Sequence, residues 1–534
     1  MVKLMEKLIQ TRIINKVKIT ECQGGGKKGV GTRDHLLILN SIIRNFRRGK
    51  KTLHIIFLDV EKAFDKAWRD GIMNILNKRG CDLKNWIYLD KLNDKSTVKI
   101  KTKWGLTKDI NTDKVLKQGS VMSPIQYGIL IDEIAKELYN NKKGIILQEC
   151  NIPCLLWVDD IAVMKDNYNE LQEMMDIVYN ISQKYRIKYG LSKSKHLIIG
   201  DDNNPKKNIK LGDNILEKIP TYKYLGITYN RKGNLDDHIK VIDQNVMNAI
   251  YSILDVVSDK VLDKVELKTI WILIQNTITS IICYGLESFK LLKREYNKLT
   301  TIHLNAIKTI LNIPNNSASY IIYSETEIPN ITHTLKKRKI LYYKSLLKYE
   351  NRPITINAME SNDLWLKKVK EDMKEYNIEE NDLITKSKDV IKKDINIKIK
   401  EIMIKDIMEE GKKKSKVQKY IEQCNINEEN IYERKDYLIN LTKFDAKYIF
   451  MGRSGQFPCK TNHKWDNIAS LKCRWCLTRK EDEQHILRKC RKCPISNRPI
   501  NFNFFGQRCM TEWHDLSNLY MEYKNILNKR NEKR

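Results

Sequence analysis

Two apolar runs in this chain each end in acidic residues. Leu53 to Leu58 ends at Asp59, and about a hundred residues later Leu155 to Val158 ends at Asp159 and Asp160. Short apolar runs of this kind predict buried strands. Carboxylates at the ends of two such strands offer the oxygen ligands that Mg²⁺ prefers, and a pair of Mg²⁺ ions can stabilise both the attacking and the leaving oxygens of a displacement. Each run taken alone is explained as well by an ordinary strand with an acidic turn, so the remaining chain decides.

The rest of the hydrophobic pattern divides the chain into two parts. Strand-like and helix-like segments are interspersed up to about residue 230, whereas helical periodicity dominates from Asp236 to about Lys348 and continues through a more polar stretch to Tyr437. The predicted fold class is therefore α+β. The expected strands are 53–60, 97–102, the hairpin 155–164, 196–199 and 222–228, and the main expected helices are 1–19, 34–46, 125–139 and 167–185.

Charge narrows the class of partner. The 534 residues carry 97 Lys and Arg against 66 Asp and Glu, a formal net charge of +31, and 41% of them are hydrophobic, which is enough for a sizeable core. A polyanionic partner is expected, either nucleic acid or an anionic membrane surface. The most apolar segment, Thr269 to Leu286, is interrupted by Gln275 and Asn276 and is interpreted as a buried helix. Nucleic acid is therefore favoured, and no membrane partner is expected.

A glycine-rich stretch, Gln23-Gly-Gly-Gly-Lys-Lys-Gly-Val-Gly-Thr-Arg-Asp34, precedes the first core helix. Its backbone N–H groups and lysines would suit contact with phosphate, although it lacks the Gly-Lys-Ser/Thr ending of a Walker loop. The simpler interpretation, which the sequence alone favours, is a loop that leads into a helix capped by Thr32.

Five of the twelve cysteines are clustered near the C-terminus. In a chain without a secretion signal, such clustering indicates a metal site rather than disulfides. Cys473, Cys476, His485 and Cys490 have the spacing C-x2-C-x8-H-x4-C, which fits a tetrahedral Zn²⁺ site. Cys493 competes with His485 for the fourth position, because four cysteines would also suit zinc.

Several motifs together resemble those of non-LTR (LINE-type) retrotransposon reverse transcriptases, in the family's order and at workable spacings. The first catalytic motif is matched by Phe57-Leu-Asp-Val-Glu-Lys-Ala-Phe-Asp-Lys-Ala-Trp68, and the aromatic-x-Asp-Asp hairpin by Trp157-Val-Asp-Asp160. The helix start that contacts template and nucleotide is resembled by Gln118-Gly-Ser-Val-Met-Ser-Pro124, and the lysine motif by Lys193-Ser-Lys195. The primer-grip turn is resembled by Tyr224-Leu-Gly226, and the fingers glycine motif by Gln23-Gly-Gly together with Gly31-Thr-Arg-Asp34. A thumb segment of the family is resembled by Cys283-Tyr-Gly-Leu-Glu287.

The resemblance implies an RNA-directed DNA polymerase, a nucleotidyltransferase that uses two Mg²⁺ ions, with target-primed synthesis on the element's own RNA. Asp59 and Asp159 would bind both ions, with Asp160 beside them. Lys193 would neutralise or protonate the leaving pyrophosphate, although an exposed lysine is the commoner interpretation of any single lysine.

Residues that would hold substrate are implied in the same way. Phe64 would stack under the incoming sugar and reject a 2′-hydroxyl, although a core role explains Phe64 alone equally well. Asp65 is expected to be structural, as a helix cap. The other residues implied to contact template, nucleotide or primer are Gln118, Gly119, Tyr224, Leu225 and Gly226.

The resemblance also implies partners and layout. The partners would be an RNA template, a DNA primer or target and deoxynucleoside triphosphates, in the nucleus after passage through the cytoplasm as a ribonucleoprotein. The family places a histidine in the cysteine cluster, so His485 is preferred to Cys493 as a Zn²⁺ ligand. The expected architecture is a right-hand polymerase with partial fingers (1–52), a palm with an antiparallel sheet (53–230), a helical thumb (231–348), a charged helical connector (349–450) and a CCHC zinc-knuckle region (451–534).

This sequence departs from the family's pattern in several places. Trp157-Val158 replaces an aromatic followed by Ala, Gly26 replaces a Phe, and Gly190 replaces an Asn ahead of the lysine motif. Only 58 residues precede Asp59, so the upstream fingers hairpin is expected to be absent and the chain to be N-terminally truncated. Two alternatives stay open, a catalytically impaired nucleic-acid-binding remnant of such an element and a group II intron-type maturase.

Overall fold

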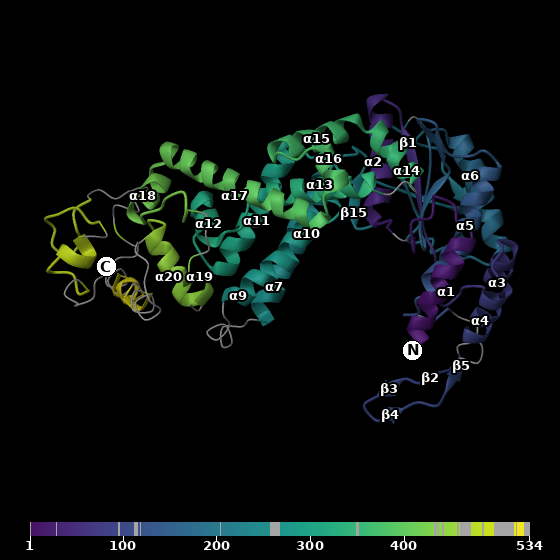
Figure 1. Cartoon of the computed structure of the whole chain (residues 1–534), viewed down its shortest axis with the longest axis horizontal. Helices are drawn as coiled ribbons and strands as arrows, with labels where there is room; N and C mark the ends of the chain where they lie inside the picture. Colours follow the sequence, from purple (N-terminus) through teal and green to yellow (C-terminus); the bar gives the residue numbers. More distant parts are fainter. Residues whose placement is uncertain are drawn as a thin grey trace. The chain divides into compact units, whose positions relative to one another are not determined.

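The computed structural model describes most of the chain. The described residues are 2–27, 29–93, 97–111, 116–117, 119–202, 204–256, 267–348, 352–431, 435, 437–440, 443–456, 459, 471–482, 485–495, 517–519 and 521–527. They form two compact units (Figure 1). The first comprises residues 1–238, 285–290 and 342–371, and the second comprises residues 239–284, 291–341 and 372–534.

The first unit is built on a five-stranded sheet with the order β13-β10-β1-β9-β8. Its central strand β1 pairs antiparallel with β10 on one side and with β9 on the other, and only β13 runs parallel to its neighbour. The antiparallel sheet predicted for the palm is therefore present. The strand bounds are β1 Leu53–Asp59, β8 Cys154–Trp157, β9 Asp160–Lys165, β10 Lys195–Ile199 and β13 Glu217–Ile219.

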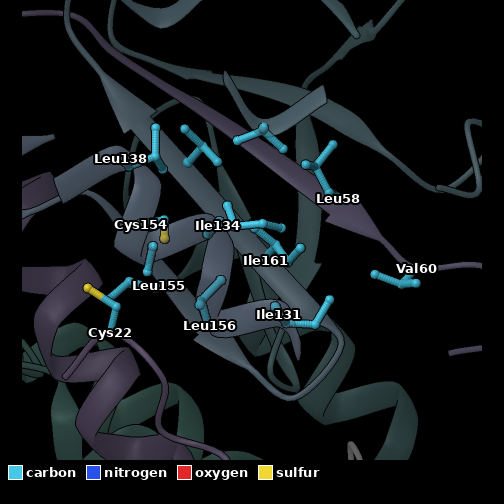
Figure 2. Close-up of a cluster of buried hydrophobic side chains, with 14 of the residues drawn as sticks. Cys22, Leu58, Val60, Ile131, Ile134, Leu138, Cys154, Leu155, Leu156 and Ile161 are labelled. Atoms are coloured by element: carbon cyan, nitrogen blue, oxygen red, sulfur yellow. The ribbon is translucent and has the colours of Figure 1, made fainter. Parts of the chain in front are cut away.

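One face of this sheet is closed by helices. Helices α5 (Ser123–Asn140) and α6 (Tyr168–Lys184) pack against each other and against β8 and β9. Figure 2 shows Leu58, Ile134 and Ile161 meeting in this core, and all three side chains are almost fully buried. Side chains alternate between the faces of a strand, so Phe57 and Asp59 point to the opposite face from Leu58.

The remaining helices of the first unit follow the hydrophobic pattern. The helix expected from residue 34 is α2, and it begins two residues earlier, because the Asp34 carboxylate accepts the Gly31 N–H at 2.6 Å and caps the helix in place of Thr32. The Asp34 carboxylate is itself buried against Arg352 at 2.9 Å. The bounds are α1 Val2–Lys16, α2 Thr32–Arg48, α3 Arg69–Lys78, α4 Leu83–Asn93 and α14 Pro353–Ser361.

Short hairpins complete the first unit. The segment expected as one strand over 222–228 is a two-stranded hairpin, β14 (Thr221–Tyr224) and β15 (Ile227–Asn230), which turns at Leu225 and Gly226 because both have positive φ. The strand expected over 97–102 is likewise split into short pieces. The other short strands are β2 Thr97–Val98, β3 Lys101–Thr102, β4 Gly105–Leu106, β5 Ile110–Asn111, β6 Ile145–Leu147, β7 Cys150–Ile152, β11 Lys210–Leu211 and β12 Asn214–Ile215.

The second unit is helical, as the periodicity predicts. Three of its helices begin or end in the first unit's segments, namely α7 (Asp236–Val256), α13 (Ile331–Leu347) and α15 (Asp363–Glu375). The others are α9 Leu267–Leu273, the π-helix η1 Ile274–Ile278, α10 Thr279–Cys283, α11 Lys293–Leu311, α12 Ser319–Thr326, α16 Glu380–Thr385, α17 Lys388–Lys413, α18 Ser415–Gln423, α19 Tyr437–Asn440, α20 Lys443–Arg453 and the π-turn η3 His485–Lys489; the 3-10 turn η2 (Leu286–Ser288) belongs to the first unit.

The most apolar helical segment is interrupted rather than continuous. Among the described residues, Thr269–Ser288 is long and apolar enough to cross a membrane by length and composition alone, and 44% of its most apolar window is buried within the protein. A π-helical turn interrupts it at Ile274, and Trp271, Ile274 and Ile278 are buried. This burial agrees with the interpretation of the segment as a core helix.

Candidate active site and metal centre

The three predicted catalytic carboxylates lie at one end of the sheet. Asp59 is the last residue of β1, Asp160 is the first residue of β9, and the register pairs them directly across the two strands. Asp159 occupies the two-residue turn between β8 and β9, after Val158. Val158 has a φ of +59°, which is rare for a β-branched residue and marks a strained turn at this position. The predicted hairpin therefore delivers both of its aspartates beside Asp59.

These carboxylates affect one another's ionisation. Burial, followed by the charge of Asp59, raises the pKa of Asp159. Burial, followed by the charges of Asp159 and Asp59, raises the pKa of Asp160 to about 6. Negative charge that is concentrated and partly shielded from water favours a bound cation, and oxygen ligands suit a hard divalent ion. The donor set therefore fits Mg²⁺.

The segment that precedes β10 holds Asp59 from the side. The Gly190 N–H donates to the Asp59 carbonyl oxygen at 2.9 Å, and the Asp59 N–H donates to Ser194 Oγ at 3.2 Å. Lys193 extends from the same turn and brings its Nζ to 3.7 Å from Asp59 Oδ2, with 72% of its side chain exposed. A Cβ on Gly190 would lie 3.1 Å from Asp59 Oδ2. Lys193 is therefore at the site, and glycine at position 190 leaves room for the carboxylate.

The glycine-rich loop positions the Asp159 turn. Gln23 Oε1 accepts the backbone N–H of Val158 at 3.1 Å and that of Gly25 at 2.9 Å, and the Gln23 side chain is fully buried. Added Cβ atoms would come within 2.9 Å of Trp157 at Gly24 and within 2.4 Å of Val158 at Gly25. The sequence left phosphate contact or a simple loop open for these three residues, and the resemblance assigned them to a fingers glycine motif. Their contact with the Asp159 turn was not predicted, because only the folded chain brings them against it.

The residues implied to hold substrate are partly described. Phe64 is half-buried, with its ring 5.6 Å from that of Tyr127. Gly119 has a φ of +84° and open space where a Cβ would be, so its backbone is exposed. Gln118 lies outside the described residues.

The hairpin of β14 and β15 covers the catalytic face of the sheet. The Tyr222 ring stacks on Phe57 with centroids 4.2 Å apart and planes at 5°, and Tyr224 lies 5.1 Å from the same ring. Burial, followed by the charges of Asp160 and Asp59, raises the pKa of Tyr222 to about 12. The predicted turn Tyr224-Leu225-Gly226 therefore belongs to a hairpin whose aromatic side chains lie close to the carboxylates.

Comparison with known proteins shows what the first part of the chain is similar to. Residues 1–229 match the family described as reverse transcriptase (RNA-dependent DNA polymerase). These residues therefore form a domain that is similar to the reverse transcriptases of non-LTR retrotransposons. The retrovirus-related Pol polyprotein from the type-1 retrotransposable element R2 of Popillia japonica is 26% identical over 241 residues, which cover 43% of this chain and 34% of that protein.

Another relative matches more of this chain. The RNA-directed DNA polymerase from the mobile element jockey of Drosophila melanogaster is 20% identical over 361 residues, which cover 65% of this chain and 38% of that protein. This chain thus spans between a third and two fifths of the length of these two relatives. A telomerase structure from Candida tropicalis, in complex with a TWJ fragment of telomeric RNA, aligns with a TM-score of 0.34 at 13% identity, over 74% of this chain and 56% of that one.

The acidic residue next to Phe64 is not the N-cap residue of the helix that follows it. The residue at the N-cap of α3 is Trp68, without a side-chain cap, and Asp65 is exposed in the turn before it. The prediction of Asp65 as a helix cap is therefore wrong. Helix α3 begins only at Arg69, where the apolar residues of its buried face resume, so Asp65 lies in the turn between β1 and α3.

The predicted zinc ligands converge in the second unit. The ligand atoms of Cys473, Cys476, His485 and Cys490 all lie within 4.8 Å of one another. Cys473 Sγ is 3.7 Å from Cys490 Sγ, and Cys476 Sγ is 3.2 Å from His485 Nε2. His485 Nδ1 is buried without a partner among the described residues. This cluster is compatible with Zn²⁺, and it contains His485 rather than Cys493.

Proposed function

We propose that this chain is an RNA-directed DNA polymerase that adds deoxynucleotides to a DNA primer. The observation that supports this most directly is the convergence of Asp59, Asp159 and Asp160 at adjacent strand ends within a reverse transcriptase domain. Their shared negative charge, together with the raised pKa values of Asp159 and Asp160, fits a site that binds cations.

Asp59 and Asp159 would hold two Mg²⁺ ions, with Asp160 beside them. When bound, such ions supply positive charge to the attacking and leaving oxygens of phosphoryl transfer. The protein's own groups act around that charge. Lys193, which is exposed and already 3.7 Å from Asp59, can reach the pyrophosphate leaving group and neutralise it.

The remaining residues would position the substrates. Phe64 would lie under the sugar of the incoming nucleotide and disfavour a 2′-hydroxyl by its bulk. The exposed backbone of Gly119, with Gln118, would pack on the new base pair, since nothing occupies the space where a Cβ of Gly119 would be. The turn Tyr224-Leu225-Gly226 would contact the primer, because its hairpin covers the catalytic face.

We further propose that synthesis is target-primed on the element's own RNA and takes place in the nucleus, which the protein reaches from the cytoplasm as a ribonucleoprotein. The net charge of +31 supports partners that carry phosphate backbones, both an RNA template and a DNA target. The four-ligand cluster at Cys473 would bind Zn²⁺ and fix the fold around it, since a structural zinc site contributes directly to stability.

Primer extension tests the polymerase proposal. Purified chain, an RNA template annealed to a DNA primer, Mg²⁺ and deoxynucleoside triphosphates should give extended primer, and Asp159→Asn should abolish extension. Asp65→Asn is the matched control, because Asp65 carries the same charge in the same motif but is exposed and is not one of the three converging carboxylates. Absence of extension by the wild type, or equal extension by Asp159→Asn, would overturn the proposal. If RNA binding persists without extension, the chain is a nucleic-acid-binding remnant.

A further inference from the structure

A cavity of about 730 Å³ lies in the helical second unit, within a single compact unit of the fold. It is lined by residues of η1, α10, α11, α13 and α17, most of which are labelled in Figure 1. Its volume lies within the range of about 300–1,000 Å³ that is typical of small-molecule sites. The catalytic carboxylates are not among its lining residues, so the polymerase site does not explain it.

The cavity wall is cationic. Lys337 on α13 and Lys392, Lys393 and Lys400 on α17 line it, against the two acids Glu327 and Asp389. Asp389 is paired with Lys392 at 3.2 Å. A lysine-rich helix face is often exposed to solvent with no further role, but here lysines of the two helices α13 and α17 line the same cavity.

Lys337 is the most informative of these lysines. Its Nζ donates to Asn396 Oδ1 at 2.9 Å, and among the described residues no carboxylate lies within ion-pair distance of it. Burial, followed by the nearby charge of Lys392, lowers the pKa of Lys337. A half-buried ammonium that has only a neutral partner and faces other lysines leaves positive charge for an anion to balance.

A second, independent observation comes from His303 on α11. Its side chain is 2% exposed and lines the cavity, yet neither ring nitrogen has a hydrogen-bond partner in the part of the chain that the structure describes. Burial lowers the pKa of His303 to about 4, so its ring is neutral at pH 7 and offers one N–H donor. Buried polar atoms normally have partners, so this one marks a place where a ligand can bond.

The π-helical turn η1 adds to the site. Gln275 lies within it and Thr279 follows it directly, and both line the same cavity. Single π-turns within helices occur frequently at functional sites, because the extra residue displaces side chains from regular helical positions. Amide and hydroxyl groups beside lysines and a histidine donor suit a tetrahedral oxyanion.

We propose that this cavity binds a phosphate group, presented either by a free phosphate-bearing small molecule or by a nucleic-acid strand. Lys337, Lys393 and Lys400 supply charge without an internal ion pair among the described residues, and His303 supplies a neutral donor. The polymerase carboxylates do not line this site, and its binding of phosphate does not depend on polymerase activity.

Calorimetric titration of the full chain without divalent cations tests the proposal. Inorganic pyrophosphate is the first probe, and a twelve-nucleotide single-stranded RNA is the second. The test variant is Lys393→Met with Lys400→Met, both exposed and therefore compatible with folding. The control is Lys398→Met with Lys405→Met, which removes the same charge from the same helix outside the cavity.

Pyrophosphate should bind the wild type, and the cavity variant should bind it about tenfold more weakly, since each lysine gives a charge-assisted bond. The control should change affinity less than about twofold. A parallel loss of RNA affinity in the cavity variant alone identifies a strand phosphate as the ligand, whereas an unchanged RNA affinity identifies a free phosphate compound. No binding of pyrophosphate by the wild type, or equal weakening in both double variants, overturns the proposal.

Discussion

Gly190 leaves no room for a side chain beside the first catalytic aspartate. A Cβ at this position would lie 3.1 Å from Asp59 Oδ2, tighter than most real contacts, and the backbone cannot easily retreat because the Gly190 N–H is bonded to the Asp59 carbonyl oxygen. Gly190→Ala should therefore displace the carboxylate by a few tenths of an ångström and lower the rate of primer extension about tenfold. Single-turnover kinetics would measure this.

The matched control for that substitution is Gly49→Ala. A Cβ on Gly49, at the end of α2, meets its nearest atom at an ordinary 3.5 Å. Its effect on extension should be negligible. If Gly190→Ala extends primers as fast as the wild type, Asp59 tolerates a neighbouring methyl and the departure from the family's Asn carries no catalytic consequence.

The ionisation of Asp160 gives a pH-dependent prediction. Its pKa is raised to about 6 from the ordinary 3.8, so the folded state binds a proton more tightly than the unfolded state. The contribution of Asp160 to the free energy of unfolding is therefore fully present below pH 3.8 and is lost as the pH rises through about 6. In scanning fluorimetry without metal, the Tm of the wild type should therefore fall more between pH 5 and pH 7 than the Tm of Asp160→Asn.

Magnesium should reverse that loss. A cation replaces the proton as the partner of the carboxylates, so the rise in Tm caused by Mg²⁺ should be larger at pH 7 than at pH 5. Identical pH slopes for the wild type and Asp160→Asn would contradict the charge coupling within the site.

At the scale of elements, the glycine-rich loop supports the catalytic turn through one buried side chain. Gln23→Ala removes the acceptor of the Val158 and Gly25 N–H groups, and buried donors without partners cost about 1–3 kcal/mol each. With two such donors, we expect the free energy of unfolding to fall by about 2–6 kcal/mol and primer extension to be slower. Urea denaturation and extension assays measure the two effects.

The exposed Gln183 on α6 provides the control for Gln23→Ala. Gln183→Ala should leave both the unfolding midpoint and primer extension unchanged. A Gln23→Ala variant as active as Gln183→Ala would show that the Asp159 turn holds its position without the loop.

This loop also shows what a sequence can and cannot predict. The strand that ends in Asp59 and the hairpin that carries Asp159 and Asp160 were predictable, because local apolar runs and acidic turns specify them. The roles of Gln23, Gly24 and Gly25 were not, because the contacts that give these residues a role join segments about 135 residues apart. Local pattern likewise failed at Tyr222 to Thr228, where the two-residue turn depends on positive φ at Leu225 as well as at Gly226.

The cysteine cluster is the second element with a decisive test. Cys473, Cys476, His485 and Cys490 converge, so Cys490→Ser should lose zinc that Cys493→Ser retains. Atomic absorption on dialysed protein should find about one Zn²⁺ per wild-type chain. If Cys493→Ser loses zinc and His485→Ala keeps it, the fourth ligand is Cys493 and not His485.

At the scale of the whole molecule, the domain boundaries of fingers, palm, thumb and connector stay predictions, while the contacts divide the described chain into two units. Residues 342–371, expected at the end of the thumb and in the connector, belong to the first unit, where Arg352 pairs with Asp34. No local pattern in the sequence predicts that the chain returns to the first unit, because the two paired residues are some three hundred residues apart. The periodicity of the sequence therefore predicted that these residues are helical, but it did not predict to which compact unit the helices belong.

A buried ion pair joins distant segments of the second unit in the same way. Glu325 on α12 accepts from Arg453 Nε at 3.0 Å and from the Tyr437 hydroxyl at 2.7 Å, and it is also bonded to the hydroxyl of Tyr420. Glu325 is fully buried and Arg453 is 5% exposed. Burial opposes ionisation, but the charge and hydrogen bonds of Arg453 outweigh it and lower the pKa of Glu325.

Glu325→Gln would leave the charge of Arg453 buried without an opposite charge beside it. Removing one partner of a buried pair costs about 3–5 kcal/mol, so urea unfolding of the second unit should shift by that amount. Glu401→Gln, which breaks the exposed pair with Lys398, should cost less than about 1 kcal/mol. Because the network spans α12, α18, α19 and α20, a single cooperative shift would show that these helices unfold together. A loss confined to part of the unit would place an independent folding boundary between α12 and α20.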